Sequence, residues 1–187
     1  VYLWADGLYV KAGLEKDKAA VLVVIGALRD GSKEILAVES GVRESVESWK
    51  AVLRTLKARG LSSPRLSIAD GHLGIWGALA EIYPESAEQR CWNHKLINVL
   101  DQLPRREHPT ARALLCQLPY AETQAQCERL RRQVAERYGR RYPKAVETLE
   151  RDWERMGTFY RFPREHWKHL RTTNVVESPF AAVRLRT

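Results

Sequence analysis

The run of residues from Ala19 to Leu28, AAVLVVIGAL, places the strongest limit on what this chain can fold into. It is too short to cross a bilayer and predicts a buried β-strand. The stretch before it, Val1 to Val10, alternates in hydrophobicity and predicts another strand, joined through a polar turn at Glu15 to Lys18. Arg29 to Ser32 is a hairpin signal, and Glu34 to Glu39 follows it as a third strand. The chain therefore begins with an antiparallel meander of three strands.

The periodicity then changes to that of helices. Ser45 is a helix N-cap by residue type, and Gly60 is expected to end the same helix as its C′ residue. A short strand is expected at Leu66 to Ala69, a second helix at Leu73 to Ile82, and a further short strand at Ala87 to Arg90. The predicted order is β-β-β-α-β-α, which indicates an α/β fold with a mixed sheet of antiparallel and then parallel strands.

From Trp92 to about Arg171 the chain is expected to be almost wholly helical. We divide it into a first part of the core at residues 1–91, a helical insertion at 92–171, and a return to the core at 172–187. Prolines punctuate the insertion. The expected helices are Asn93–Gln102, Pro109–Gln117, Thr123–Tyr138 and Pro143–Arg155.

The formal net charge of +8 over 187 residues favours an anionic partner. Much of this charge lies in the predicted insertion, where Arg140 and Arg141 are candidate DNA contacts. Trp153 and Trp167 lie among these cations and could stack on a base or pack the helical block. Solvated helix faces explain the charge equally well. Three cysteines at irregular spacing do not make a disulfide framework and suit a reducing compartment.

Two aspartates are expected to meet in the sheet. Asp6 lies on the first strand, and Asp70 follows the strand at Leu66 to Ala69. A right-handed crossover allows that strand to pair in parallel beside the first one. Adjacent carboxylates repel unless a cation neutralises them, and Mg²⁺ does so with oxygen ligands. The alternative is that each aspartate is only a turn residue beside a glycine.

A third carboxylate, Glu177, lies in the stretch TTNVVESPF near the end of the chain. If Asn174 is an N-cap, Glu177 completes a form of capping box. If Ser178 is the N-cap instead, Pro179 takes the first helical position and Glu177 stands outside the helix. The local pattern leaves these alternatives open.

Several short motifs surround the three carboxylates: Asp70-x3-Gly74-Ile75, Tyr83-Pro84-x-Ser86 and Gln89-x-Cys91-x2-His94, with WADGLYVK around Asp6 and TTNVVES around Glu177. Together they resemble the motifs of the Mutator-type transposases, a family that includes many bacterial insertion-sequence transposases. These blocks span the whole chain. Ile82 departs from the family pattern, which prefers a small residue or Thr there, and Pro179 stands where the family more often has another residue.

The resemblance implies a ribonuclease-H-like catalytic core interrupted by a helical insertion. It also implies that Asp6, Asp70 and Glu177 are the catalytic acidic triad and hold two Mg²⁺ or Mn²⁺ ions. Paired divalent ions stabilise the attacking and leaving oxygens of phosphodiester cleavage. Water would attack first, and the freed 3′-hydroxyl would then attack target DNA.

Cys91 and His94 also have the spacing of half a zinc site. A structural or DNA-facing role beside the active site is the alternative, since the pair belongs to the family motif. Thr173 and Asn174 could orient Glu177 or contact phosphate. The candidates for the other half of a zinc site are His72, His108, Cys116, Cys127, His166 and His169.

The expected partners are the element ends and the target DNA, with a homodimer or higher assembly on DNA, in the bacterial cytoplasm and with no membrane contact. The only methionine is Met156, so we expect the chain to be part of a longer protein. Family members carry an upstream region that recognises terminal repeats, and we expect weak, sequence-independent DNA binding from this chain. Two alternatives remain: a nuclease of the same fold without strand transfer, and a basic DNA-binding remnant without catalysis.

Overall fold

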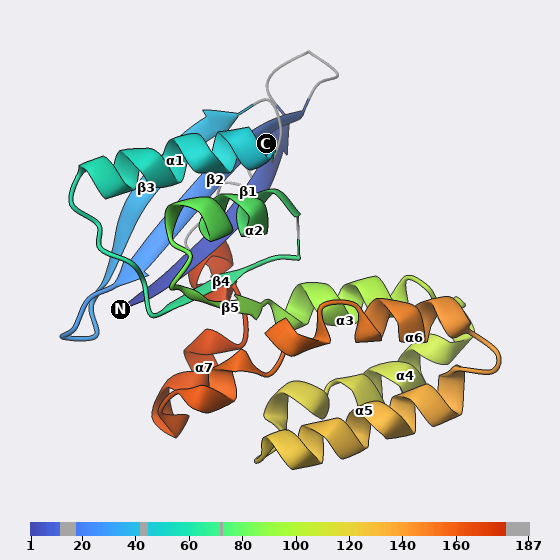
Figure 1. The fold of residues 1–187 in the computed structure, drawn as a ribbon. Helices are drawn as coiled ribbons and strands as arrows, with labels where there is room; N and C mark the ends of the chain where they lie inside the picture. The colour runs from blue at the N-terminus through green and yellow to red at the C-terminus, as the bar shows by residue number, and fades with distance from the viewer. Residues whose placement is uncertain (12–17, 42–44, 72, 179–187) are drawn as a thin grey trace.

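The computed structural model describes residues 1–11, 18–41, 45–71 and 73–178. A mixed sheet of five strands forms its centre, in the order β3-β2-β1-β4-β5 (Figure 1). β1, β2 and β3 pair antiparallel, and β4 and β5 continue the sheet in parallel with β1. The expected meander and the parallel pairing are confirmed. The strands are β1 (Tyr2–Lys11), β2 (Lys18–Ala27), β3 (Lys33–Gly41), β4 (Leu66–Ala69) and β5 (Ala87–Arg90).

The hairpin turn between β2 and β3 forms as its sequence predicts. Gly31 adopts a positive φ of 87°, which side chains rarely allow. Asp30 accepts hydrogen bonds from the backbone N–H and the hydroxyl of Ser32, at 2.9 and 2.7 Å. Residues 15–17 of the expected polar turn between β1 and β2 lie outside the described part of the chain.

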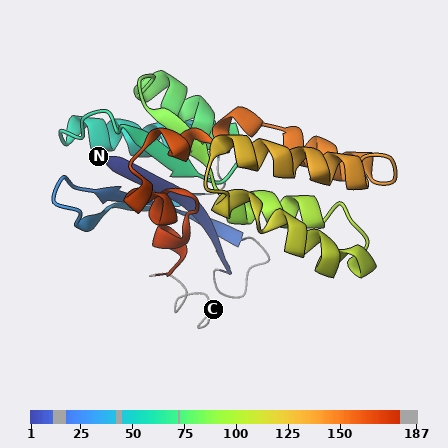
Figure 2. The same ribbon diagram turned by 90° about the horizontal axis from the view of Figure 1, so that it is seen from below.

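Helices cover both faces of the sheet, because successive side chains of each strand point to opposite faces. Leu3 and Ala5 of β1 pack with α1 (Val46–Ala58) and α2 (Leu73–Ile82) on one face. Trp4 packs on the other face, with Leu170 of α7 (Trp167–Leu170) and with the helical block. Figure 2 shows α1 and α2 on one side of the strands and α7 on the other.

Both ends of α1 follow the sequence signals. Ser45 is the N-cap, and its hydroxyl accepts the backbone N–H of Ser48 at 3.1 Å. Gly60 has a φ of 93°, and the N–H of Leu61 reaches back to the carbonyl of Leu56 at 3.0 Å. This is the Schellman arrangement, in which a left-handed glycine closes the helix.

The elements after β5 are helical throughout the described residues. The block extends from the β5 edge of the sheet, and α7 returns toward β1 (Figure 1). In the described part of the chain, no helix is long and apolar enough to cross a membrane. Among the described residues, five short 3₁₀ helices connect the longer ones: η1 (Arg105–Glu107), η2 (Leu118–Tyr120), η3 (Trp153–Arg155), η4 (Thr158–Arg161) and η5 (Arg164–His166). The α-helices of the block are α3 (Trp92–Leu100), α4 (His108–Leu115), α5 (Gln124–Tyr138) and α6 (Pro143–Glu150).

The helix expected over Pro143–Arg155 is shorter than predicted, because α6 ends at Glu150. Asp152 adopts a left-handed conformation with a φ of 57° and cannot continue the helix. The side chain of Lys95 on α3 explains where α6 ends. Its ammonium donates to the carbonyl of Thr148 at 2.8 Å and also to that of Arg151. These carbonyls belong to the helix end, where a cation is favourable.

Lys95 should make stability depend on pH. Its side chain is fully buried, and burial, with Arg90 nearby, lowers its pKa to about 7. Between about pH 7 and the ordinary lysine value near 10, the unfolded chain binds the proton that the folded chain has lost. The contribution of Lys95 to the unfolding free energy therefore rises with pH over this range and is lowest below pH 7.

Wild type and Lys95→Met should be compared by urea unfolding across this pH range. The stability difference should shift in favour of the wild type as the pH rises. Other groups also titrate over this pH range, and their contributions cancel when the unfolding free energies of the two proteins are subtracted at each pH. A difference that stays constant with pH would contradict the prediction.

Candidate active site

The pairing of β1 with β4 brings two carboxylates to the same edge of the sheet. The parallel register runs to Ala5 opposite Ala69, and the next residues along the two strands are Asp6 and Asp70. Asp6 is almost completely buried at 5% exposure, while Asp70 is partly exposed just beyond β4. The juxtaposition predicted from the strand order is present.

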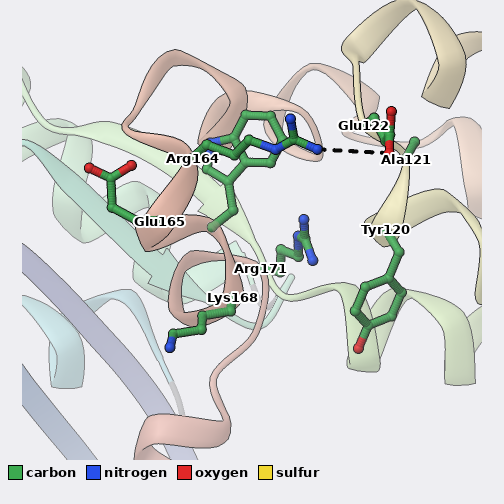
Figure 3. Close-up of a pocket in the computed structure, with 8 residues that line it drawn as sticks. Tyr120, Ala121, Glu122, Arg164, Glu165, Lys168 and Arg171 are labelled. Atoms are coloured by element: carbon green, nitrogen blue, oxygen red, sulfur yellow. Dashed lines mark ion pairs between the residues drawn. The ribbon is translucent and has the colours of Figure 1, made fainter.

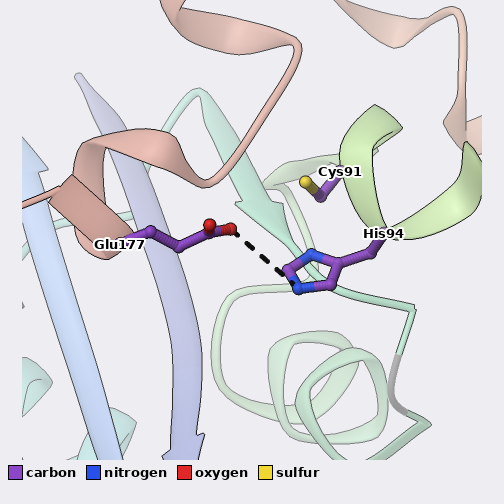
Figure 4. A group of neighbouring side chains, drawn as sticks. All are labelled: Cys91, His94 and Glu177. Carbon is purple, nitrogen blue, oxygen red and sulfur yellow. Dashed lines mark ion pairs between the residues drawn. The ribbon is translucent and has the colours of Figure 1, made fainter. Parts of the chain in front are cut away.

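His94 of α3 lies between Asp70 and Glu177. Its Nδ1 is 3.9 Å from Oδ1 of Asp70, and its Nε2 is 3.9 Å from Oε1 of Glu177. Both distances are too long for hydrogen bonds but short enough for electrostatic attraction. Figure 4 shows Glu177 and His94 pointing toward each other, with Cys91 beside them. Asp70 and Glu177 thus lie on either side of the imidazole, beside the site as the family motif led us to expect. Among the described residues, Asp6, Asp70 and Glu177 do not themselves form a group whose donor atoms all lie within 4.8 Å of one another.

The charge state of His94 follows from this environment. Burial alone would lower its pKa, but the Cys91 sulfur and the carboxylates of Asp70 and Asp6 outweigh burial and raise it to about 9. The imidazole therefore carries a positive charge at neutral pH in this arrangement. That charge partly balances the carboxylates.

Thr173 positions Glu177. Residues 174–178 are helical, and the carbonyl of Thr173 accepts the backbone N–H groups of Val176 and Glu177. The Thr173 hydroxyl donates to Glu177 Oε1 at 3.1 Å and lies 3.4 Å from the Cys91 sulfur. Both capping arrangements considered for this stretch are wrong, because Asn174 is already the first helical residue and Thr173 precedes the helix in the N-cap position. Ser178 is within the helix, and Pro179 lies outside the described residues.

The other predicted contact residues lie in different places. Asn174 accepts a hydrogen bond from Asn93 at 2.7 Å. Arg140 and Arg141 lie in the turn between α5 and α6, at the end of the helical block farthest from the sheet (Figure 1). Trp153 packs edge-on against Trp92 and donates to Glu128. Trp167 packs edge-on against Phe159 and Tyr160.

Cys91 belongs to a possible metal-binding group. Donor atoms of Cys91, His94 and Glu177 all lie within 4.8 Å of one another. Among the described residues, none of the candidates for the other half of a zinc site joins this group. His108 instead contacts the Leu103 carbonyl, and His72 lies outside the described residues.

A buried arginine beside Asp70 was not predicted. Arg90, the last residue of β5, is 6% exposed and pairs with Asp152 at 3.0 Å. Its guanidinium packs directly on Gly71, the residue after Asp70. Asp152 also pairs with Arg155, which bonds to Glu88 on β5. This network joins the helical block to the turn that carries Asp70. No local sequence pattern marks it, because its members are far apart in the chain.

Gly71→Ala should disturb this network. A Cβ at Gly71 would lie 2.0 Å from the Arg90 guanidinium carbon, so the guanidinium must move. Because Arg90 is buried and paired, we expect a loss of about 2 kcal/mol in unfolding free energy. Urea unfolding measures this loss.

Gly77→Ala on α2 is the matched control. Its Cβ would meet only Val46, at 3.4 Å, and alanine favours a helix by about 0.5–1 kcal/mol. An unfolding midpoint for Gly71→Ala equal to that of the wild type would show that Arg90 can move without cost.

The comparison with known protein families decides where this chain belongs. The model of the Mutator family of transposases matches residues 1–187. The chain is a member of that family. The resemblance noted in the sequence is confirmed.

Named relatives agree with this assignment. The chain is 46% identical over 187 residues to the transposase for insertion sequence element IS6120 of Mycolicibacterium smegmatis, covering all of this chain and 58% of that protein. It is 45% identical over 174 residues to the transposase for IST2 of Acidithiobacillus ferrooxidans, covering 92% of this chain and 59% of that protein. The chain therefore spans between half and two thirds of the length of these two family members.

Proposed function

We propose that this chain is the catalytic part of a transposase that cleaves DNA at the ends of an insertion element and joins the freed 3′-hydroxyl to target DNA. The observation that carries the proposal is the convergence of Asp70 and Glu177 on His94, with Asp6 on the adjoining strand. Family membership supports the same reaction class.

The fold supports a ribonuclease-H-like core. Three antiparallel strands followed by two parallel ones, with α1 and α2 on one face, agree with that assignment. We accordingly assign residues 1–91 and 172–187 to the core and 92–171 to a helical insertion. The role of this insertion would be to hold Arg90 and the segment before Glu177 in place.

The residues at the site fit hard divalent cations. Asp6, Asp70 and Glu177 offer carboxylate oxygens, the ligands that Mg²⁺ and Mn²⁺ prefer. When bound, two such ions would stabilise charge on the attacking and leaving oxygens of the phosphodiester. A structural zinc site is less well supported, because among the described residues no fourth protein donor joins Cys91, His94 and Glu177.

The other residues around the site would orient these ligands. The Thr173 hydroxyl fixes one oxygen of Glu177 through their hydrogen bond. Arg90 packs against the turn at Gly71 and limits how far Asp70 can move. Buried aromatic side chains such as Trp4 and Trp92 keep water out of the adjoining core.

The proposed partners are DNA and a second copy of the protein, since transposition joins two ends, and the proposed location is the bacterial cytoplasm. The test is a nicking assay on a DNA substrate carrying the element end, with Mg²⁺ or with a chelator, followed by strand transfer from pre-cleaved ends. Cleavage only with Mg²⁺, followed by joining, is expected. Cleavage without joining would favour a nuclease, and DNA binding without cleavage would favour a non-catalytic binding module.

A further inference from the structure

A pocket of about 380 Å³ lies beside the segment that leads to Glu177. One wall comes from Tyr120, at the end of η2 (Leu118–Tyr120), and from Glu122. The other comes from Arg164 of η5 (Arg164–His166), Lys168 of α7 and Arg171, the residue just after α7 (Figure 3). We call this cavity the Tyr120 pocket.

The pocket is tied to the candidate active site through the backbone. The carbonyl of Arg171 accepts the N–H of Trp92 at 2.9 Å, next to Cys91 in sequence. Thr173, which bonds to Glu177, follows two residues later. A ligand in the pocket would therefore contact the segment that positions Glu177.

The pocket has cations that its own acidic residues do not neutralise. Arg164 and Lys168 are exposed, and the closest approach of Arg164 to Glu122 is 3.9 Å, at the limit of an ion pair. In the part of the chain that the structure describes, Arg171 forms no ion pair, and its buried Nε has no hydrogen-bond partner. Burial lowers the pKa of its guanidinium, which is the cost of holding a cation without an anion. The guanidinium of Arg171 lies near the rings of Tyr120, Phe159 and Trp167, and an anionic ligand would add the ion-pair partner that these rings do not supply.

An aromatic ring stands beside these cations. Tyr120 is 72% exposed, the highest value among the large apolar and aromatic side chains that the structure describes. The Arg171 guanidinium carbon lies 5.0 Å from the Tyr120 ring centroid, and Figure 3 shows it between Tyr120 and Arg164. Trp167 differs, because its ring is already packed against Phe159 and Tyr160. Tyr120 therefore offers the most exposed aromatic surface of the pocket, with the Arg171 guanidinium beside its ring.

We propose that the Tyr120 pocket binds an unpaired nucleotide of a DNA strand. The base stacks on Tyr120, and its phosphate contacts Arg164, Lys168 and Arg171. A base within a duplex has both faces covered by its neighbours, so an exposed ring beside cations suits a single strand. The inference rests on the proposed function, because that function makes DNA the expected ligand. The new binding site lies outside the set of carboxylates proposed to hold the metal ions.

The test measures the Kd of the chain for a short single-stranded oligodeoxynucleotide by fluorescence anisotropy in a chelator. Tyr120→Ala should weaken binding about tenfold, since stacking on one aromatic ring has that magnitude. Tyr120→Phe should bind as the wild type does. Because Tyr120 is largely exposed, neither change should unfold the chain.

Charge variants give the second readout. Lys168→Gln should weaken binding and reduce the dependence of Kd on salt, because one phosphate contact is lost. Arg112→Gln is the matched control: Arg112 is exposed on α4 and does not line the pocket. It should leave the affinity near that of the wild type.

Two results would overturn the proposal. One is an affinity of Tyr120→Ala within about twofold of the wild type. The other is an equal loss of affinity for a blunt duplex, which would indicate backbone contacts alone. Because binding is measured in a chelator, this test is independent of cleavage. If Tyr120→Ala weakens binding but the wild type does not nick DNA with Mg²⁺, only the proposed function is refuted. If the wild type nicks DNA but Tyr120→Ala binds normally, only the pocket proposal is refuted.

Discussion

Asp70→Asn, Asp6→Asn and Glu177→Gln are each expected to reduce Mg²⁺-dependent DNA cleavage by about a thousandfold or more. Each change removes a negative charge from the proposed ligand set and leaves the side-chain volume almost unchanged. The folded structure should therefore persist. Initial rates of nicking measure the loss, and circular dichroism checks the fold.

Glu85→Gln is the matched control for these variants. It makes the same chemical change at an exposed carboxylate in the turn between α2 and β5. Its cleavage rate should equal that of the wild type. Full Mg²⁺-dependent nicking by Asp70→Asn would show that the wrong carboxylate has been assigned. Unchanged nicking by Glu177→Gln would show that Glu177 has only a structural role.

Gln89→Leu should produce the largest loss of stability among the substitutions considered. Gln89 on β5 is fully buried, and its amide donates to the carbonyls of Arg90 and Met156 at 2.8 and 3.1 Å. Its carbonyl oxygen accepts the N–H of Phe159 at 2.9 Å. Leucine would leave that N–H without its partner in the core. We expect a loss of about 3 kcal/mol in unfolding free energy.

Thermal unfolding should show this as a fall in Tm of about 6–12 °C for a chain of this size. Gln117→Leu is the control, because Gln117 is exposed in the turn just after α4 and its amide donates to the nearby carbonyl of Ala113 in that helix. That change should alter stability by less than about 0.5 kcal/mol. Equal Tm values for the two variants would mean that the Gln89 bonds do not hold the helical block to the sheet.

The elements were predictable where a local pattern repeats. Alternation defines β1, and helical spacing together with Ser45 and Gly60 defines α1. The end of α6 was not predictable, because the Lys95 ammonium that meets it comes from α3. The start of the helix that carries Glu177 was also missed, since several polar residues there can each act as a cap.

By itself, the sequence determined the order of strands and helices, and hence that Asp6 on the first strand lies next to Asp70, just beyond the neighbouring strand. Hydrophobic periodicity and turn residues are local, and the direction of a crossover between parallel strands is nearly fixed. Only the tertiary structure decided that His94 stands between Asp70 and Glu177, that Arg90 packs on Gly71, and that Arg171 faces Tyr120. These contacts join residues distant along the chain, and their distances depend on how whole helices pack against the sheet.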